Sequence, residues 1–222
     1  APGGYVLNTE IRTAELVYAG QEIEIAETAA DFYNERQKAA VLLNKVLEQN
    51  ERFGIGMNGE ITAVTFGLFA AEDLTAADGS TIPANGLLEI LSVDENGHAV
   101  CKIDLPFGSY YLKELSADGH YILSDEKYPI VFDYAGQDIA LVEIKVNDGK
   151  PIGNDLIYGE IHGLKKDEDG NALGGAVIGL FKADCTEFTR ENAILTAVSK
   201  EDGGFSFADV PYGNWLVREI EA

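Results

Sequence analysis

The stretch "FGSYYLKELSADGHYILSDEKYPIVF" spans residues 107–132, and a close copy of its first part, "YGNWLVREIEA", spans residues 212–222. In both copies apolar and aromatic residues alternate with polar ones, which places successive side chains on opposite faces of a β-strand. Turn-forming clusters such as "ADGS", "ENGH", "NDGK" and "EDGG" recur along the chain. The sequence therefore predicts an all-β protein made of short strands.

Further pairs of matching segments show that the whole chain is repetitive. The pairs are 64–74 with 177–185, 4–10 with 120–126, and 18–25 with 134–141. Their offsets correspond to a module of about 115 residues, a normal size for one domain. We expect tandem β-sandwich modules: the C-terminal strands of one module in residues 1–40, a complete module in 41–154, and the N-terminal part of a third in 155–222.

One segment has a composition that disagrees with this prediction. Residues 26–50, "AETAADFYNERQKAAVLLNKVLEQN", are rich in Ala, Glu, Leu, Lys and Gln, which favours a helix. Their part 31–45 aligns with "PIGNDLIYGEIHGLK" (151–165), whose Gly, Pro and Ile do not suit a helix. We therefore expect both segments to contain the last strand of one module, a short linker and the first strand of the next.

The composition excludes several classes of partner and cofactor. A net charge of −22 argues against binding to nucleic acid or to an anionic membrane surface, and no run of 18 apolar residues is present. Cys101 and Cys185 lie in different copies of the repeat and are expected to be thiols. The three histidines follow no metal-ligand spacing, so we expect neither a metal nor a cofactor.

Charged residues fall on apolar strand faces at three predicted positions. Glu114 shares a face with Tyr110 and Leu112, Glu219 has the same place in the second copy, and Lys45 lies on the apolar face of "VLLNKVL". Burial lowers the pKa of a lysine and raises that of a glutamate, which favours a nucleophilic amine and a carboxyl that can transfer protons. A lone lysine could instead extend its stem over apolar surface towards water.

The segments 159–185, "GEIHGLKKDEDGNALGGAVIGLFKADC", and 202–222, "DGGFSFADVPYGNWLVREIEA", resemble the Cna-B or SpaA-type domains of Gram-positive surface proteins and pilins. The resemblance covers nearly the whole chain and is looser at 51–60, where an insertion replaces a short turn. It implies prealbumin-like (Ig-like) β-sandwiches strung end to end in an extracellular, cell-wall-anchored stalk. Members of this family form an amide bond between a lysine of the first strand and an asparagine of the last, promoted by a glutamate.

The resemblance assigns these roles to specific residues. Lys45 and Asn154 take the positions of the cross-linked pair, and Glu114 takes that of the proton-shuttling glutamate. A second set, divided between the two ends of the chain, consists of Lys165, Glu219 and Asn34. Asn147 is a rival acceptor, although "NDG" is typical of a hairpin turn.

The division of the second set leads to a prediction about partners. Two partial modules would each leave a strand edge unpaired, so we expect self-association by strand complementation, head to tail or as a reciprocal dimer. A structural stalk is the leading function. An adhesin module that binds a host protein or carbohydrate is the alternative, and exposed aromatic residues lining one sandwich face would favour it. An enzyme on a transthyretin-like fold is not supported by any catalytic constellation.

Overall fold

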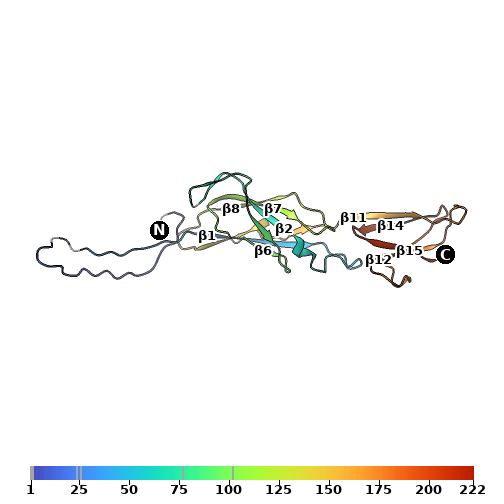
Figure 1. The fold of residues 1–222 in the computed structure, drawn as a ribbon, viewed down its shortest axis with the longest axis horizontal. Coiled ribbons are helices and arrows are strands. Elements are labelled where there is room, and N and C mark those ends of the chain that lie inside the picture. The colour runs from blue at the N-terminus through green and yellow to red at the C-terminus, as the bar shows by residue number, and fades with distance from the viewer. Residues whose placement is uncertain (1–2, 24, 26, 77, 102) are drawn as a thin grey trace.

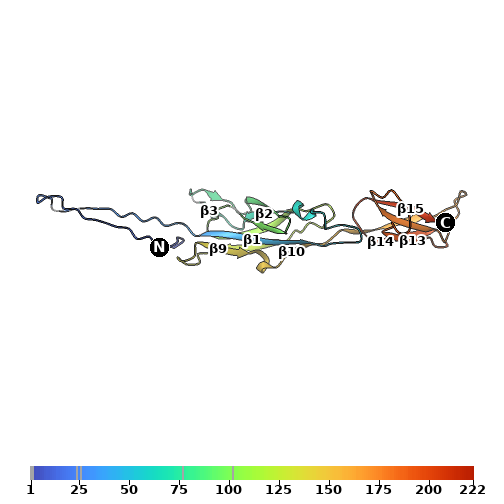
Figure 2. The same cartoon turned by 90° about the horizontal axis from the view of Figure 1, so that it is seen from below.

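The computed structural model describes all residues except 1–2, 24, 26, 77 and 102. The molecule is elongated, with an N-terminal arm at one end, a central β-sandwich, and a smaller group of strands at the C-terminal end (Figures 1 and 2). Regular structure in the described residues consists of fifteen strands and two 3-10 helices. The all-β prediction is therefore confirmed.

The central sandwich has two sheets that face each other across a common core. In one sheet β1 pairs with β6, β9 and β10, and in the other the order is β5-β2-β7-β8. The bounds are β1 Lys38–Leu47, β2 Thr65–Ala70, β5 Leu87–Ser92, β6 His98–Val100, β7 Gly108–Ser116, β8 Lys127–Phe132, β9 Leu141–Lys145 and β10 Ile152–Asn154. A small hairpin of β3 (Leu74–Thr75) and β4 (Thr81–Ile82) and the 3-10 helices η1 (Glu60–Ala63) and η2 (Val146–Gly149) complete this part.

The alternating sequence pattern explains how these strands pack. Along β7 the residues at every second position, Tyr110, Leu112 and Glu114, are buried, and β8 alternates in the same way. In the helix-like segment the expected first strand is present, because residues 38–47 form β1, but the expected last strand of a preceding module is not found in residues 31–37. The apolar residues Val41 and Leu43 of β1 are fully buried, so pairing within the sheet outweighs the helical propensity of the segment.

The C-terminal strands repeat part of this arrangement. Two sheets are present, one of β11 (Tyr158–Leu164) and β14 (Gly204–Pro211), the other with the order β13-β12-β15 (Leu195–Val198, Val177–Lys182 and Trp215–Glu221). The sheet of β11 and β14 corresponds to β1 and β6 of the central sandwich, and the sheet β13-β12-β15 corresponds to β5-β2-β7. A local detail is repeated too: Trp215 Nε1 donates to Pro211 O, as Tyr110 OH does to Pro106 O. In the described residues, these sheets contain no counterparts of β8, β9 and β10.

The insertion at 51–60 joins the two groups of strands. Phe53 and Ile55 are buried in the core of the C-terminal strands, and the rings of Phe53 and Trp215 meet edge to face at 5.0 Å. Arg52 Nε donates to Ile194 O at 2.9 Å. A loop of the central sandwich thus supplies part of the core of its neighbour.

Replacing Phe53 with Ala tests this junction. We expect the C-terminal strands to lose about 3 kcal/mol of stability, because a buried aromatic ring is removed from a packed core. Trp215, the only tryptophan, contacts Phe53, so urea unfolding followed by its fluorescence reports the loss. Met57→Ala, at an exposed position of the same loop, is the matched control and should change the midpoint little. If Phe53→Ala and Met57→Ala unfold at the same urea midpoint, the ring of Phe53 does not stabilise the C-terminal strands.

The arm, defined here as residues 3–35, differs from expectation. Strands were expected in residues 1–40, but the first strand starts at Lys38 and none occurs in the described residues of the arm; residues 1–2, 24 and 26 lie outside the description. The corresponding residues of the next copy form β8, β9 and β10, which pair with β7 or β1. In the part of the chain that the structure describes, no strand lies beside the arm to accept such pairing (Figure 1), and a strand needs a partner for its backbone groups.

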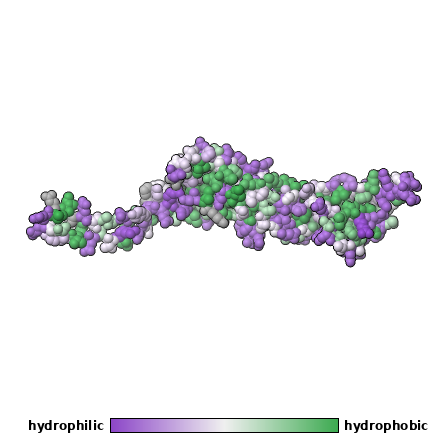
Figure 3. Space-filling view, in the orientation of Figure 1, coloured by the Kyte–Doolittle hydropathy of each residue, from purple (hydrophilic) through white to green (hydrophobic). Residues whose placement is uncertain are grey.

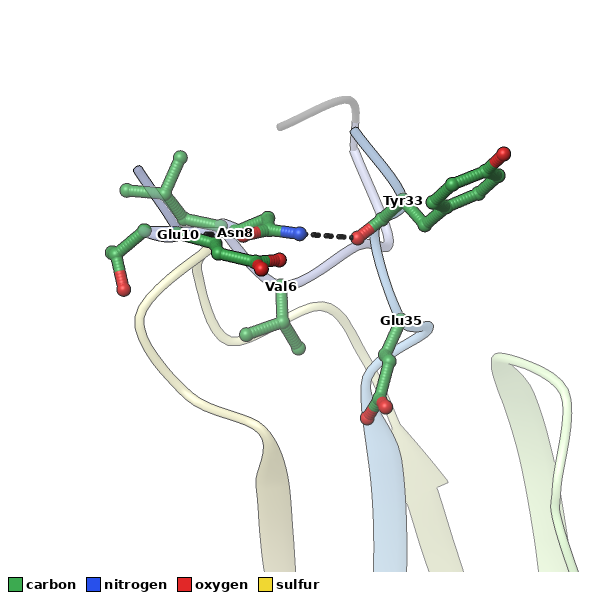
Figure 4. A pocket seen from close by; sticks show the side chains of 7 residues that line it. Val6, Asn8, Glu10, Tyr33 and Glu35 are labelled. Carbon is green, nitrogen blue, oxygen red and sulfur yellow. Dashed lines mark hydrogen bonds between the residues drawn. The ribbon is translucent and has the colours of Figure 1, made fainter. Parts of the chain in front are cut away.

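The base of the arm nevertheless repeats a contact of the central sandwich. Tyr5 forms an isolated bridge with Arg36, as Tyr121 does with Leu156. Asn8 Nδ2 donates to the carbonyl of Tyr33 at 2.8 Å and closes a shallow hollow between the two legs of the arm (Figure 4). The legs are therefore held together at their base.

Candidate cross-linking site

Three polar residues of the central sandwich converge in its core. Lys45 on β1, Glu114 on β7 and Asn154 on β10 are 2%, 1% and 4% exposed. β1 and β10 are parallel neighbours, with Lys45 opposite Ile152, and β7 belongs to the facing sheet. The structure thus brings together the first set of residues that the sequence singled out.

The side-chain amide of Asn154 lies between the other two residues. Lys45 Nζ donates to Asn154 Oδ1 and also to the carbonyl oxygens of Val46 and Ile152, at 3.0 and 3.1 Å. On its other side, Asn154 Nδ2 donates to Glu114 Oε2 at 2.9 Å. These contacts orient the amide with its carbonyl towards the lysine and its nitrogen towards the glutamate.

The two oxygens of Glu114 have different surroundings. Oε2 accepts from the backbone N–H of Ser124 at 2.9 Å as well as from Asn154. Oε1 is buried and has no hydrogen-bond partner in the part of the chain that the structure describes, and it lies 3.8 Å from Lys45 Nζ. A buried oxygen in this state is costly unless it binds a proton or a nearby donor. Its position suits a group that receives a proton from Lys45.

Burial also changes the acidity of Lys45. Desolvation lowers the pKa of its ammonium from 10.5 to about 8, against the opposing effect of the negative charges of Glu114 and Asp155. A larger fraction of the amine is therefore neutral near neutral pH than for an exposed lysine. Only the neutral amine has the lone pair that a nucleophile requires.

A glycine positions the backbone of this lysine in each copy of the repeat. Gly97 accepts from Lys45 N at 2.6 Å and has φ +81°, and a Cβ there would lie 2.2 Å from Lys45 O. Gly203 is related to Lys165 in the same way, with a 2.8 Å hydrogen bond, φ +77° and a Cβ distance of 2.4 Å. A side chain at either glycine would separate the turn from the lysine strand. The contact with the lysine strand thus explains why the "ENGH" and "EDGG" turns have glycine at positions 97 and 203.

The second set is brought together only in part. Lys165 Nζ lies 2.9 Å from Glu219 Oε2, but these side chains are 27% and 34% exposed, whereas those of Lys45 and Glu114 are fully buried. Asn34 belongs to the arm, which extends from the central sandwich on the side away from the C-terminal strands (Figure 1). The structure therefore separates Asn34 from the lysine and glutamate of its set.

The other residues considered in the sequence lie apart from the site. Asn147 is an exposed residue of η2 with φ +52°, and its side chain donates to Lys150 O at 3.4 Å, as expected for a turn. Cys101 is buried and Cys185 is partly buried, both as free thiols. In the described residues, no group of three potential metal ligands and no helix able to span a membrane is found.

The lowered pKa of Lys45 gives a prediction for a variant that lacks the side-chain amide of Asn154. In Asn154→Ala, unfolding raises the pKa of Lys45 from about 8 towards 10.5, so between these values the unfolded state binds more protons. Stability should therefore rise with pH across this window, by about 3 kcal/mol in total. Denaturant titrations of Asn154→Ala and of Asn154→Ala/Lys45→Met give the free energy of unfolding at each pH. Subtracting one from the other removes the contribution of the other titratable groups. If the difference does not change with pH, the prediction is wrong.

Comparisons with known proteins agree with this architecture. Residues 159–222 match the family model described as SpaA, a prealbumin-like fold domain, and no curated protein sequence matches the chain. The Bacillus anthracis TIE protein is structurally similar over 100% of this chain and 35% of its own, with a TM-score of 0.64 and 21% identity. The C-terminal fragment of the pilus adhesin SpaC from Lactobacillus rhamnosus GG covers 84% of this chain and 76% of its own, with a TM-score of 0.46 and 13% identity. The family match confirms the SpaA-type resemblance over residues 159–222, and the prealbumin-like sandwich fold predicted from the sequence is confirmed.

Proposed function

Since residues 159–222 match a SpaA-type prealbumin-like domain, we propose that this chain is a segment of a pilin-like stalk on a Gram-positive cell surface. Its central sandwich is cross-linked by an amide between Lys45 and Asn154, and Glu114 transfers the protons. The observation that supports this most directly is the burial of these three side chains in one hydrogen-bonded cluster. The protein is extracellular and attached to the cell wall as part of a longer chain.

The reaction replaces the side-chain amide of Asn154 with an amide to Lys45, and nothing is oxidised or reduced. The neutral Nζ of Lys45 attacks Cγ of Asn154, a C–N bond forms, and the original amide nitrogen leaves as ammonia. Glu114 takes the proton from Nζ and delivers it to the leaving nitrogen, with which its Oε2 is already in contact at 2.9 Å. Backbone carbonyl acceptors hold Nζ against the amide before reaction.

The positions of the two strands suggest what the bond does mechanically. β1 and β10 run parallel and side by side, so the chain enters at one end of the sandwich and leaves at the other. Tension applied to the ends would otherwise shear the hydrogen bonds between these strands. The amide transmits that tension directly from Lys45 to Asn154, so residues 46–153 bear none of it.

The arrangement of aromatic residues gives no support to the adhesin alternative. Among the described residues, large exposed aromatics do not line one face of the sandwich, and several belong to the arm: Tyr5, Tyr18, Phe32 and Tyr33. The stalk function is therefore better supported than the adhesin function.

Intact mass spectrometry tests the cross-link. The wild-type protein should weigh one ammonia less for this site than its sequence requires, and Lys45→Ala or Glu114→Ala should restore that ammonia. Asn147→Ala is the matched control, because it removes an exposed asparagine from a turn and should leave the mass deficit unchanged. A wild-type protein that keeps its full mass after prolonged incubation would rule out the bond.

A further inference from the structure

The core of the C-terminal strands begins beside the cross-linking site. Tyr121 and Leu156 are buried in this core, at 4% and 3% exposure, although neither of them lies in a C-terminal strand. Tyr121 directly precedes Ile122, and Leu156 is two residues after Asn154. The chain therefore passes from one core into the other within a few residues of the reactive asparagine.

The two segments that carry these core residues pair with each other. Residues 120–122 and 155–157 are joined by the bridge between Tyr121 and Leu156 and by two backbone hydrogen bonds of 2.9 Å, one on either side of it. We call this pairing the ladder. Because both bridging side chains are buried in the C-terminal core, the position of the ladder depends on that core.

The ladder segment also supplies contacts to the reacting groups. The carbonyl of Ile122 accepts from Asn154 Nδ2 at 2.8 Å, so it holds the nitrogen that leaves as ammonia. Two residues later, the N–H of Ser124 donates to Glu114 Oε2 at 2.9 Å. A shift of this segment would therefore displace both the asparagine amide and the glutamate.

Glu48, three residues after Lys45, fastens the ladder to β1. Its Oε2 accepts from the N–H of Leu156 at 2.7 Å, and its backbone carbonyl accepts from the hydroxyl of Tyr121 at 3.0 Å. Its own N–H donates to the carbonyl of Asn154 at 3.0 Å. The lysine strand, the asparagine strand and the ladder are thus joined at one residue.

The rest of the C-terminal core comes from two other parts of the chain. Its remaining buried members are Phe53 and Ile55 of the insertion at 51–60, and Ala176, Ile178, Leu180, Phe207 and Val210 at the C-terminal strands. In the space-filling view the surface continues without a break from the central sandwich into these strands (Figure 3). If the C-terminal strands are unfolded, Tyr121 and Leu156 face water, and their burial no longer stabilises the ladder.

From these contacts we propose that folding of the C-terminal strands controls the cross-link of the central sandwich. The amide between Lys45 and Asn154 forms at its full rate only when Tyr121 and Leu156, as positioning residues, are packed in the C-terminal core. This control rests on the proposed function, because it concerns the rate of the same reaction, in which one amide bond forms and one ammonia leaves.

The physical basis is the geometry that the reaction requires. A nucleophile and its target react quickly only when they are held in contact and aligned, and a misplacement of about 1 Å can slow a reaction about 100-fold. An unpacked ladder releases the amide nitrogen of Asn154 from the carbonyl of Ile122. Since the bond is irreversible, the central sandwich is locked only after its C-terminal neighbour has folded.

The experiment follows cross-linking in the newly made 222-residue chain. The protein is synthesised in a cell-free reaction, synthesis is stopped, and aliquots are quenched in acid, so that intact mass gives the fraction that has lost one ammonia at each time. Phe207→Ala and Leu180→Ala remove buried side chains from the C-terminal core, and neither residue belongs to the core of the central sandwich. We expect both variants to form the amide about tenfold more slowly than the wild type, a typical coupling between two sites of a protein.

Two further variants show whether packing of the C-terminal core is the cause. Val198→Ala changes a residue of β13 that is 57% exposed, and it should cross-link at the wild-type rate. Phe207→Leu keeps a large apolar side chain in the core and should recover most of the rate that Phe207→Ala loses. Hydrogen exchange measured by mass spectrometry should show β2 and β7 still protected in Phe207→Ala, as in a folded central sandwich.

The possible results are distinguishable. Equal rates for the wild type, Phe207→Ala and Leu180→Ala overturn the proposed control and leave the Lys45–Asn154 bond standing. Loss of protection in β2 and β7 also overturns it, because slow cross-linking would then follow from unfolding of the sandwich itself. A wild type that never loses ammonia refutes the proposed function, and the control with it.

Discussion

Lys45→Met should lower the unfolding temperature of the central sandwich by about 20 °C. The proposed amide closes a loop from residue 45 to residue 154, and a covalent closure of that length restricts the unfolded chain by about 4–5 kcal/mol. For a domain of this size, each kcal/mol corresponds to about 4–8 °C. Calorimetry, in guanidinium chloride if the wild type melts too high, measures the difference.

The choice of methionine separates the cross-link from other effects of the substitution. Met has nearly the length of the lysine stem, so it fills the same buried space without leaving a cavity or an unpaired ammonium. Lys150→Met, at an exposed position next to the 3-10 helix η2, is the matched control and should melt with the wild type. If Lys45→Met and Lys150→Met unfold within a few degrees of each other, the amide does not stabilise the sandwich.

Stretching single molecules should show a second large effect. In the wild type, the proposed amide should pass tension from β1 to β10, so residues 46–153 should add nothing to the extended length. Lys45→Met should release this segment in one step of about 360–390 Å, less the original size of the sandwich, at 3.3–3.6 Å per residue. Atomic force spectroscopy with handles at the two ends of the chain measures the step.

Each stretched molecule also contains its own reference step. The C-terminal strands unfold in both the wild type and Lys45→Met, and their shorter step identifies the traces in which a single molecule was held. Asn147→Ala should give the wild-type pattern, since it leaves the Lys45–Asn154 pair intact. A step of full length in wild-type traces would show that the tension is not transmitted through the amide.

The sequence singled out the three residues that the structure brings together in the central sandwich. Period-two alternation placed Glu114 on the inner face of its strand, and the family resemblance pointed to Asn154 and Lys45. The helical composition of residues 38–47 was misleading on its own, and the repeat corrected it. Local patterns succeed here because β1, β7 and β10 all find their partners within residues 38–154.

The insertion at 51–60 shows a role that the repeat did not predict. From sequence it was only a departure from the short turn of the other copy, and nothing in its pattern indicated a partner. In the structure Phe53 packs against Trp215, more than 150 residues away along the chain. A contact of this kind depends on how two sandwiches meet, which neither one encodes in its own periodicity.

Residues 3–35 mark the limit of what the sequence determined by itself. It predicted the all-β fold class and singled out Glu114 and Lys45 on apolar strand faces, because alternation is a local property of the chain. Only the tertiary structure decided which copies become strands: residues 127–154 form β8, β9 and β10, whereas the corresponding part of the arm does not. The physical reason is that a β-strand is stabilised by hydrogen bonds to a neighbour, and among the described residues no strand pairs with the arm.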